Sequence, residues 1–339
     1  MLILLSSTSA ARYREDVLRC LTAPVDARLQ FRYRKSLISE DLLRRAELGQ
    51  LVGTGLVCFL DANGYDLLSI VPVRSVEVTD VRLHGTTISM TLEMKAFAYA
   101  ETKAFTHVLG RAAKDTCPYN ADGEIHGKYL FEVKEALTEL HLSSSVEGWE
   151  KTVGCVRLQQ AFQSEPYFWT VLGIEKEGEK ISSEEFSRWP NTPVNGGFSI
   201  LVYHYQESGA PAPNSKLSLV VGKAVMNVGP DELKIDSRYD LKRWRFEPRT
   251  ASYFPTETWL RFRVGDTWDL DLSVQVGGSF WINFAKSLVV GTLIAVPSIT
   301  ALAPQRDVDF SMKLLLVGLS LIAGVGAALA VVFGIEKVG

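Results

Sequence analysis

The 339-residue chain lacks the short patterns that mark most enzyme and metal sites. It contains no GxSxG, HExxH, P-loop or protein-kinase signature, and its five histidines are scattered rather than spaced as metal ligands. Its four cysteines form no CxxC pair, which argues against a structural zinc site and provides no disulfide framework. We therefore predict no enzymatic activity, no cofactor and no metal, with an enzyme of unfamiliar site as an alternative.

The sequence also lacks a basic excess and an export signal. Its formal net charge of −3 disfavours a nucleic-acid partner, because nucleic-acid binders carry a clear excess of Lys and Arg. The apolar run Met1–Leu5 ends at Ser6, whereas a signal peptide needs an apolar core of about 7–15 residues. Leu2–Leu5 is instead predicted to be a short buried strand, so the body of the protein is expected in the cytoplasm.

Uncharged apolar stretches are concentrated near the C-terminus. Residues 288–303 and 314–335 carry no charge and are joined by a short polar segment. The first stretch reaches the ~20 residues that cross a bilayer when the residues from Phe280 are included, and the second stretch is long enough by itself. We predict a two-helix transmembrane hairpin at 279–339, with spans at about 281–303 and 313–335, in a multi-pass membrane protein whose N-terminal region is cytoplasmic. The alternative is a hydrophobic helical pair buried in a globular core.

Several residues of the predicted hairpin have expected roles in lipid. Trp281 suits the membrane interface, and Lys286 can extend toward the headgroups. Small residues recur at four-residue spacing in the second span, which lets helices approach closely and predicts self-association. They are Ser320, Gly324, Gly326, Ala328 and Ala330. The alternative is that glycine is simply common in membrane helices.

The residues before 146 indicate a mainly β, α+β domain. Apolar runs with strand periodicity are separated by turn signals such as Asn63-Gly64 and His84-Gly85. These runs are Arg28–Arg34, Gly55–Asp61, Asp66–Leu83 and Thr86–Ala100. They predict a β-meander or small barrel over residues 1–145, in which Pro72 marks an edge or a bend.

Short helices accompany these strands. Ser39 is the expected N-cap of a helix that continues to about Leu48 and ends at Gly49. The charge pattern of Leu130–Leu142 predicts a second helix, and the polar loop after it predicts a domain boundary at residue 145. Residues 146–278 then show seven strand-like runs between Gly and Asn turns, which predicts a β-sandwich.

One group of arginines is a candidate site for a phosphate-bearing ligand. Arg28, Arg32 and Arg34 lie at even offsets, so they share one face of an extended strand, and Arg74 is a candidate fourth member. Arginine forks match phosphate oxygens in geometry and charge. The alternative is a solvated sheet face whose charge is balanced by neighbouring acidic residues.

A second basic segment, residues 234–263, lies shortly before the predicted membrane hairpin. Arg243, Trp244, Arg245 and Arg249 form a basic and aromatic surface that suits anionic lipid. The alternative is an ordinary sheet face. Asp269 and Asp271 also alternate on a strand, and we interpret them as a solvated strand face rather than as a carboxylate pair.

The sequence as a whole favours a membrane-anchored sensor or effector that binds a ligand or a protein partner through its β-rich body. The hairpin would then self-associate or perturb the membrane, a layout analogous to prokaryotic immunity-type (antiviral defence) effectors. The alternative from another class is a passive, membrane-anchored interaction subunit of a larger complex.

Overall fold

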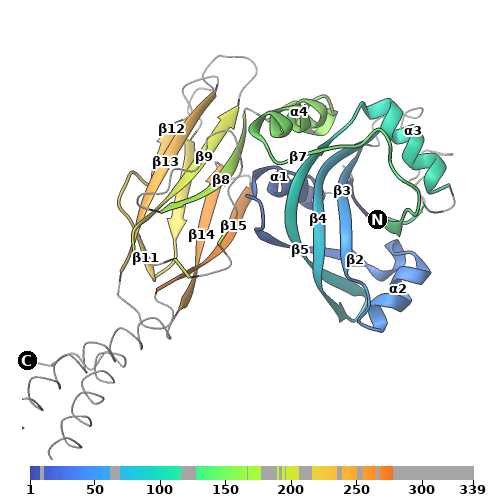
Figure 1. Ribbon diagram of the computed structural model, residues 1–339, viewed down its shortest axis with the longest axis horizontal. Coiled ribbons are helices and arrows are strands. Elements are labelled where there is room, and N and C mark those ends of the chain that lie inside the picture. The colour runs from blue at the N-terminus through green and yellow to red at the C-terminus, as the bar shows by residue number, and fades with distance from the viewer. Residues whose placement is uncertain are drawn as a thin grey trace, which may run out of the picture.

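The computed structural model contains two β-rich parts that lie side by side (Figure 1). We call residues 1–165 the half-barrel and residues 167–277 the sandwich. The structure describes residues 1–7, 11–61, 69–114, 116, 127–165, 167–176, 189–190, 193–194, 196–205, 216–234, 239–249, 255–264 and 268–277.

The half-barrel is one mixed sheet with the strand order β2-β5-β4-β3-β1-β6, in which β7 also pairs with β5. Its strands are β1 (Leu2–Ser7), β2 (Arg28–Arg34), β3 (Gly53–Asp61), β4 (Ser69–His84), β5 (Thr87–Tyr99), β6 (Leu130–Glu132) and β7 (His141–Ser143). Strands β1 and β3 are parallel, and the other pairs are antiparallel. Every residue of β1 is buried, as its continuous apolar sequence predicts for a strand covered on both faces.

The sheet curls strongly. The Tyr33 hydroxyl of edge strand β2 donates to the Leu5 carbonyl of β1 over 3.2 Å, although three strands separate β2 from β1 in the sheet order. Just beyond β2, Ile38 forms a bridge with Leu130 of β6. The long strand β4 also shifts register against β3 beside Pro72, where the missing N–H is tolerated at a bend.

Four described α-helices pack on this sheet: α1 (Ala11–Thr22), α2 (Glu40–Glu47), α3 (Thr102–Ala112) and α4 (Val146–Arg157). Single 3₁₀ turns occupy Lys35–Leu37 (η1) and Gln160–Phe162 (η2). Helix α4 begins where the Ser145 hydroxyl accepts a hydrogen bond from Gly148 N, and α4 packs on β5 and β4. The chain therefore leaves the half-barrel after η2 rather than at residue 145.

The sandwich consists of two four-stranded antiparallel sheets with the orders β12-β10-β14-β15 and β11-β13-β9-β8. The strands are β8 (Phe168–Lys176), β9 (Phe198–Tyr205), β10 (Lys216–Val221), β11 (Val225–Asn227), β12 (Glu232–Lys234), β13 (Tyr239–Pro248), β14 (Thr256–Val264) and β15 (Trp268–Val276). Alternate residues enter a core of packed aromatic rings, in which Phe198 stacks on Phe246 and Trp244 is tilted against Phe262. The predicted antiparallel strands of this part are confirmed.

Helix α1 joins the two parts. It lies between the curved sheet and the edge strands β8 and β15 of the sandwich (Figure 1). The Arg19 side chain donates to the Asp269 carbonyl of β15 over 3.0 Å. On the neighbouring helix α4, Glu150 accepts a 2.7 Å hydrogen bond from the Tyr203 hydroxyl of β9. The half-barrel therefore covers two sheet edges that would otherwise expose unpaired backbone groups.

The predicted fold class is wrong as stated. The described N-terminal part is a mixed, half-barrel sheet rather than a β-meander or small barrel, because α1 and the elements after it separate the parallel strands β1 and β3. No helix among the described residues combines the length and apolar character needed to cross a membrane. The predicted hairpin at 279–339 lies outside the described residues.

The predicted local elements had mixed outcomes. The strands at Leu2–Leu5 and Arg28–Arg34 and the helix that follows Ser39 are confirmed. The predicted helix at Leu130–Leu142 is wrong, since this stretch contains β6, a connecting segment and the start of β7. Its scattered charges lie on exposed or half-buried positions, and the helix begins instead at Val146 after its Ser145 cap.

Asp16 of α1 is 7% exposed, and this burial raises its pKa to about 6 although Arg19 opposes the shift. Ionisation therefore favours the unfolded chain, and the wild type loses stability as pH rises from about 4 through 6. The Asn side chain of Asp16→Asn does not titrate. We therefore predict that the free energy of unfolding of this variant, relative to that of the wild type, rises by about 2–3 kcal/mol when the pH is raised from 4 to 7.5. Urea unfolding at both pH values measures this difference.

The matched control is Asp41→Asn, whose side chain is 64% exposed on α2. Its stability relative to the wild type should change by less than about 0.5 kcal/mol over the same pH range. A stability difference for Asp16→Asn that is the same at pH 4 and pH 7.5 would contradict the assignment.

Candidate functional site

A cavity of about 280 Å³ lies where the half-barrel meets the sandwich. Its lining residues come from both parts of the fold and from the segment that connects β8 with β9. They are Asp26, Arg28, Trp189, Pro190, Glu257, Leu272, Ser273 and Gln275. We call this cavity the cleft. Its volume is at the lower end of ligand pockets, so it suits a small molecule.

The half-barrel wall of the cleft follows directly from α1. Asp26 has a left-handed backbone with φ of 65°, which turns the chain from the end of α1 into β2. Its carboxylate accepts a 2.8 Å hydrogen bond from Lys95 Nζ of β5. Lys95 also donates to Glu93 over 2.5 Å, and Arg28 Nε lies 3.5 Å from the same carboxylate group. This ion-paired network fixes the charged side of the cleft.

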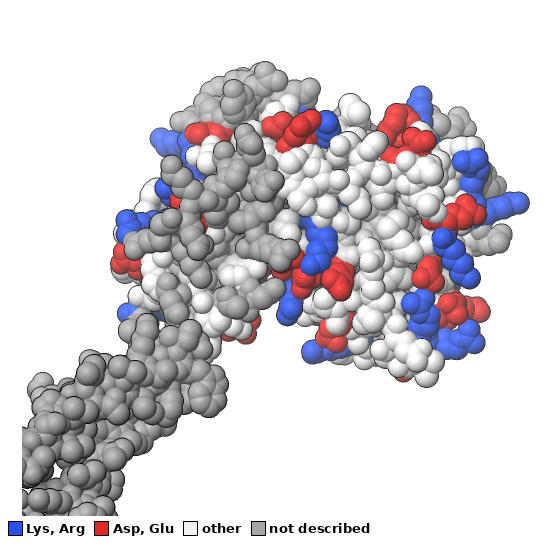
Figure 2. All heavy atoms as spheres, viewed as in Figure 1, with Lys and Arg blue, Asp and Glu red and all other residues white. Residues whose placement is uncertain are grey.

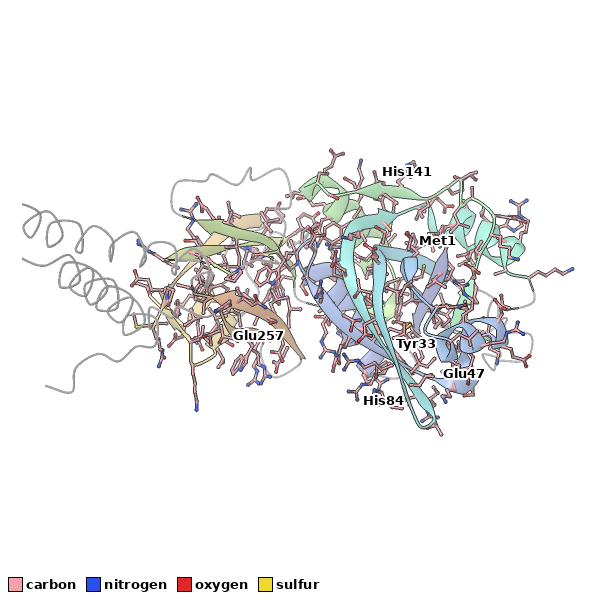
Figure 3. The ribbon with its side chains drawn as sticks, turned by 60° about the horizontal axis from the view of Figure 1, so that its bottom comes forward. Met1, Tyr33, Glu47, His84, His141 and Glu257 are labelled. Carbon is pink, nitrogen blue, oxygen red and sulfur yellow. The ribbon has the colours of Figure 1, made fainter. Side chains whose placement is uncertain are left out.

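The opposite wall is the outer face of β14 and β15. Glu257 extends from β14 in this part of the sandwich (Figure 3). Its carboxylate accepts a 2.5 Å hydrogen bond from the Ser273 hydroxyl. Gln275 lies two residues further along β15 and directly opposite Glu257 in the register. This wall therefore presents a carboxylate, a hydroxyl and an amide, which both donate and accept hydrogen bonds.

Trp189 ties the two walls together. Its backbone N–H donates to the Val25 carbonyl of the half-barrel over 2.7 Å. Its indole N–H donates to the Ser273 carbonyl of the sandwich, also over 2.7 Å. Val194, further along the same segment, pairs with Val276 at the edge of β15. The buried indole thus supplies an apolar floor and holds both walls at a fixed separation.

Buried titratable groups gather around α1 rather than in the cleft. Burial raises the pKa of the Cys20 thiol and of the Tyr33 hydroxyl, so both stay protonated at neutral pH. A buried, protonated thiol is a poor nucleophile. The described residues also contain no group of three His, Cys, Asp or Glu that could hold a metal ion.

The predicted arginine face comes together only in part. Arg28, Arg32 and Arg34 are exposed on one face of β2, as the alternation predicts. The Arg28 side chain, however, forms an ion pair with Glu93 and lines the cleft.

The inclusion of Arg74 is wrong, because this side chain is completely buried. It donates to the Lys95 carbonyl over 2.6 Å and to the Cys20 carbonyl over 3.2 Å, and it lies 3.7 Å from the ring centre of Phe97. Burial lowers its pKa to about 9, which still leaves it charged at neutral pH.

The sheet register adds two residues that the sequence pattern did not include. Arg82 and Arg32 both lie opposite Ser89, while His84 and Arg34 both lie opposite Thr87. His84 lies at the tip of the β4–β5 hairpin (Figure 3). We call the outer face that carries Arg32, Arg34, Arg82 and His84 the basic face. The turn at Gly85, which was predicted, is the signal from which this register could have been derived.

The second predicted basic surface does not form one patch. Trp244 is fully buried and its indole donates to the Pro230 carbonyl, so its expected exposure to lipid is wrong. Arg243 pairs with Glu175 at 2.8 Å. Arg245 lies 3.9 Å from Glu247.

Two further arginines of this segment, Arg249 and Arg261, do not join Arg243 and Arg245. Arg249 donates to the Val225 carbonyl. Arg261 lies on the other sheet of the sandwich, where its guanidinium donates two hydrogen bonds to the Asp271 carboxylate. The interpretation of Asp269 and Asp271 as a solvated strand face is confirmed, since both point outward beside arginines.

Charges of both signs lie next to one another on the surface shown in Figure 2. This distribution follows from the cross-strand pairs of arginine with aspartate or glutamate. The remaining predicted site residues, Trp281, Lys286, Ser320, Gly324, Gly326, Ala328 and Ala330, lie outside the described residues.

We predict that Lys95→Met destabilises the protein by about 1–3 kcal/mol, because it removes the cation that the nearly buried carboxylates of Asp26 and Glu93 share. The control is Lys216→Met, since Lys216 pairs with Glu232 at the surface and both side chains are about half exposed. It should cost less than about 1 kcal/mol. Urea unfolding at pH 7 compares the variants, and equal losses would contradict the structural role of Lys95.

Comparisons with known proteins do not identify a family. No protein-family model matches the chain, and no curated protein matches it. Among solved structures, the chain is similar to the crystal structure of a FixG-related protein from Vibrio parahaemolyticus, with 8% sequence identity and a TM-score of 0.21. The similarity covers 34% of this chain and 98% of that chain. A likeness of this extent carries no argument about function.

Proposed function

We propose that the protein is a ligand-binding sensor whose ligand is a small polar molecule held in the cleft. The observation that carries this proposal is the origin of the lining residues. Asp26 and Arg28 come from the half-barrel, whereas Glu257, Ser273 and Gln275 come from the sandwich. A ligand that hydrogen-bonds to both sets stabilises one relative placement of the two parts, because only that placement offers all the contacts.

The position of the cleft supports a role in signalling to the C-terminal part of the chain. Ser273 and Gln275 line the cleft, and β15 ends at Val276. A ligand bound to these residues therefore acts within a few residues of the segment that follows the sandwich. The expected membrane localisation and self-association of that segment stay predictions.

The charge of the lining narrows the class of ligand. Asp26 and Glu257 bring carboxylates from opposite walls, and the Arg28 guanidinium lies close to Glu93. A strongly anionic ligand would meet two carboxylates inside the cavity, which is unfavourable. Neutral, hydrogen-bonding molecules and small cations fit the lining better.

We predict that Glu257→Gln and Gln275→Leu each weaken ligand binding at least tenfold, because the first replaces a charged acceptor by a neutral amide and the second removes an amide from the same wall. The full chain is titrated by calorimetry with amino acids, amines, nucleosides and neutral sugars, and the best binder is then tested on the variants. Glu232→Gln, on the distant strand β12, is the control and should bind normally. A best binder that is insensitive to both cleft variants would contradict the proposal.

A second candidate function, anion binding, is favoured by the register of the basic face. Arg32 with Arg82 and Arg34 with His84 form two neighbouring rows, separated by the hydroxyls of Ser89 and Thr87. Adjacent strands are about 4.8 Å apart and alternate residues about 7 Å apart, so the four positions form a rectangle of roughly 10 by 7 Å. Guanidinium groups at this spacing suit a phosphate-bearing ligand, which would compete with Asp80 for Arg82.

We predict that pyrophosphate binds the full chain and that the double variant Arg34→Gln/Arg82→Gln binds it at least tenfold more weakly. The physical reason is the loss of two charge-assisted contacts, and the effect should shrink as salt is raised. Calorimetric titration at fixed ionic strength measures it. The control is Arg44→Gln/Arg243→Gln, which removes two exposed arginines outside the basic face. Equal losses in both double variants, or no binding by the parent, would rule out a specific site.

A further inference from the structure

Trp259 is exposed beside the cleft. Its exposed fraction is 42%, whereas Trp149, Trp169 and Trp244 are buried in the two parts of the fold. An indole ring is the largest apolar side chain, and leaving it in water costs the stability that its burial would contribute. Its position on the outer face of β14 therefore calls for an explanation beyond folding.

The register places this ring next to the residues that line the cleft. Trp259 lies directly opposite Ser273 on β15, and Glu257 opposite Gln275. Directly opposite side chains in such a pair are about 5 Å apart, and alternate residues along one strand are about 7 Å apart. The indole is thus directly across from Ser273 and two residues along β14 from Glu257, on the same face of the sheet. The wall of the cleft continues onto Trp259 without a change of sheet or face.

A fixed cation contacts the exposed indole. The Arg261 guanidinium lies 5.2 Å from the centre of the Trp259 ring and is itself held by two bonds of 2.6 and 2.8 Å to Asp271.

From this arrangement we infer that the ligand of the cleft is a neutral carbohydrate of at least two rings, an inference that rests on the proposed ligand-binding function. A sugar ring has a face of C–H bonds that stacks on the electron-rich face of an indole. Its rim of hydroxyls needs acceptors and donors side by side, which Glu257, Gln275 and Ser273 supply. One ring stacks on Trp259, and the next enters the cleft between Glu257 and Asp26.

The experiment titrates the full chain with neutral disaccharides, such as maltose, cellobiose, lactose and chitobiose, and with the corresponding monosaccharides. Calorimetry measures affinity, and the emission of the exposed tryptophan reports stacking. We expect one disaccharide to bind at least tenfold more tightly than its monosaccharides. Trp259→Ala should lose at least tenfold in affinity, whereas Trp259→Tyr, which keeps an aromatic face, should retain most of it.

The matched control is Leu241→Ala, because Leu241 is 40% exposed on the other sheet of the sandwich. Unfolding curves of all variants confirm that each is folded before affinities are compared. Disaccharide binding that is equal in Trp259→Ala and the wild type would overturn the inference. Binding of another ligand class that depends on Glu257, without any sugar binding, would overturn it while leaving the proposed function standing. A parent chain that binds no small polar molecule would remove both.

Discussion

The C-terminal end of α1 is the constraint on which the arrangement of both parts depends. The last carbonyl groups of a helix have no partner inside it, and burial requires that each find one elsewhere. Here the Cys20 carbonyl accepts from Arg74 of β4, the Leu21 carbonyl from Trp149 of α4 and the Thr22 carbonyl from Thr170 of β8. The preceding carbonyl, that of Arg19, accepts from Ala23 N at 2.9 Å. Side chains from both the half-barrel and the sandwich therefore meet at one helix terminus. A buried guanidinium is also favourable there, since the helix dipole places negative charge at this end.

The same constraint shapes the cleft. Because the end of α1 is fixed, the chain can reach β2 only through a tight reversal, which the left-handed backbone of Asp26 provides. The reversal exposes the Val25 carbonyl to Trp189 and directs Asp26 toward the sandwich. The walls of the cleft are thus positioned by hydrogen bonds that exist for packing reasons. A ligand that bridges both walls adds its contacts to these hydrogen bonds and so stabilises the same placement of the two parts.

Sequence patterns predicted individual strands well and the assembled sites poorly, for reasons that particular residues illustrate. Arg28–Arg34 alternates because one face of β2 is buried and the other is not, and that is a local property. Arg74 looks equivalent in sequence, yet β4 is covered on its second face by helices, so its arginine lies in the core. Glu257 and Gln275 become neighbours only through the pairing of β14 with β15, and Asp26 joins them from 230 residues away. Such contacts depend on tertiary register, which no short window of sequence contains. Helix α1 was not among the predicted elements although its sequence is amphipathic, so its helical periodicity is a local signal that could have been used.

Perturbed pKa values mark the scaffold in this protein rather than the candidate ligand site. Burial shifts the pKa of Asp16, Cys20 and Arg74, and all three lie at or beside α1. Shifts of this kind often indicate catalysis, but structural networks produce them as well, and geometry decides between the two. The Cys20 thiol is kept neutral, and the guanidinium of Arg74 is directed at backbone carbonyls, so neither presents a reactive group to a substrate. The cleft has the opposite character: its polar groups border an open volume, come from both parts and continue onto an exposed aromatic ring. Those are the properties that the proposed ligand-binding function requires of a surface that recognises shape and hydrogen-bonding pattern.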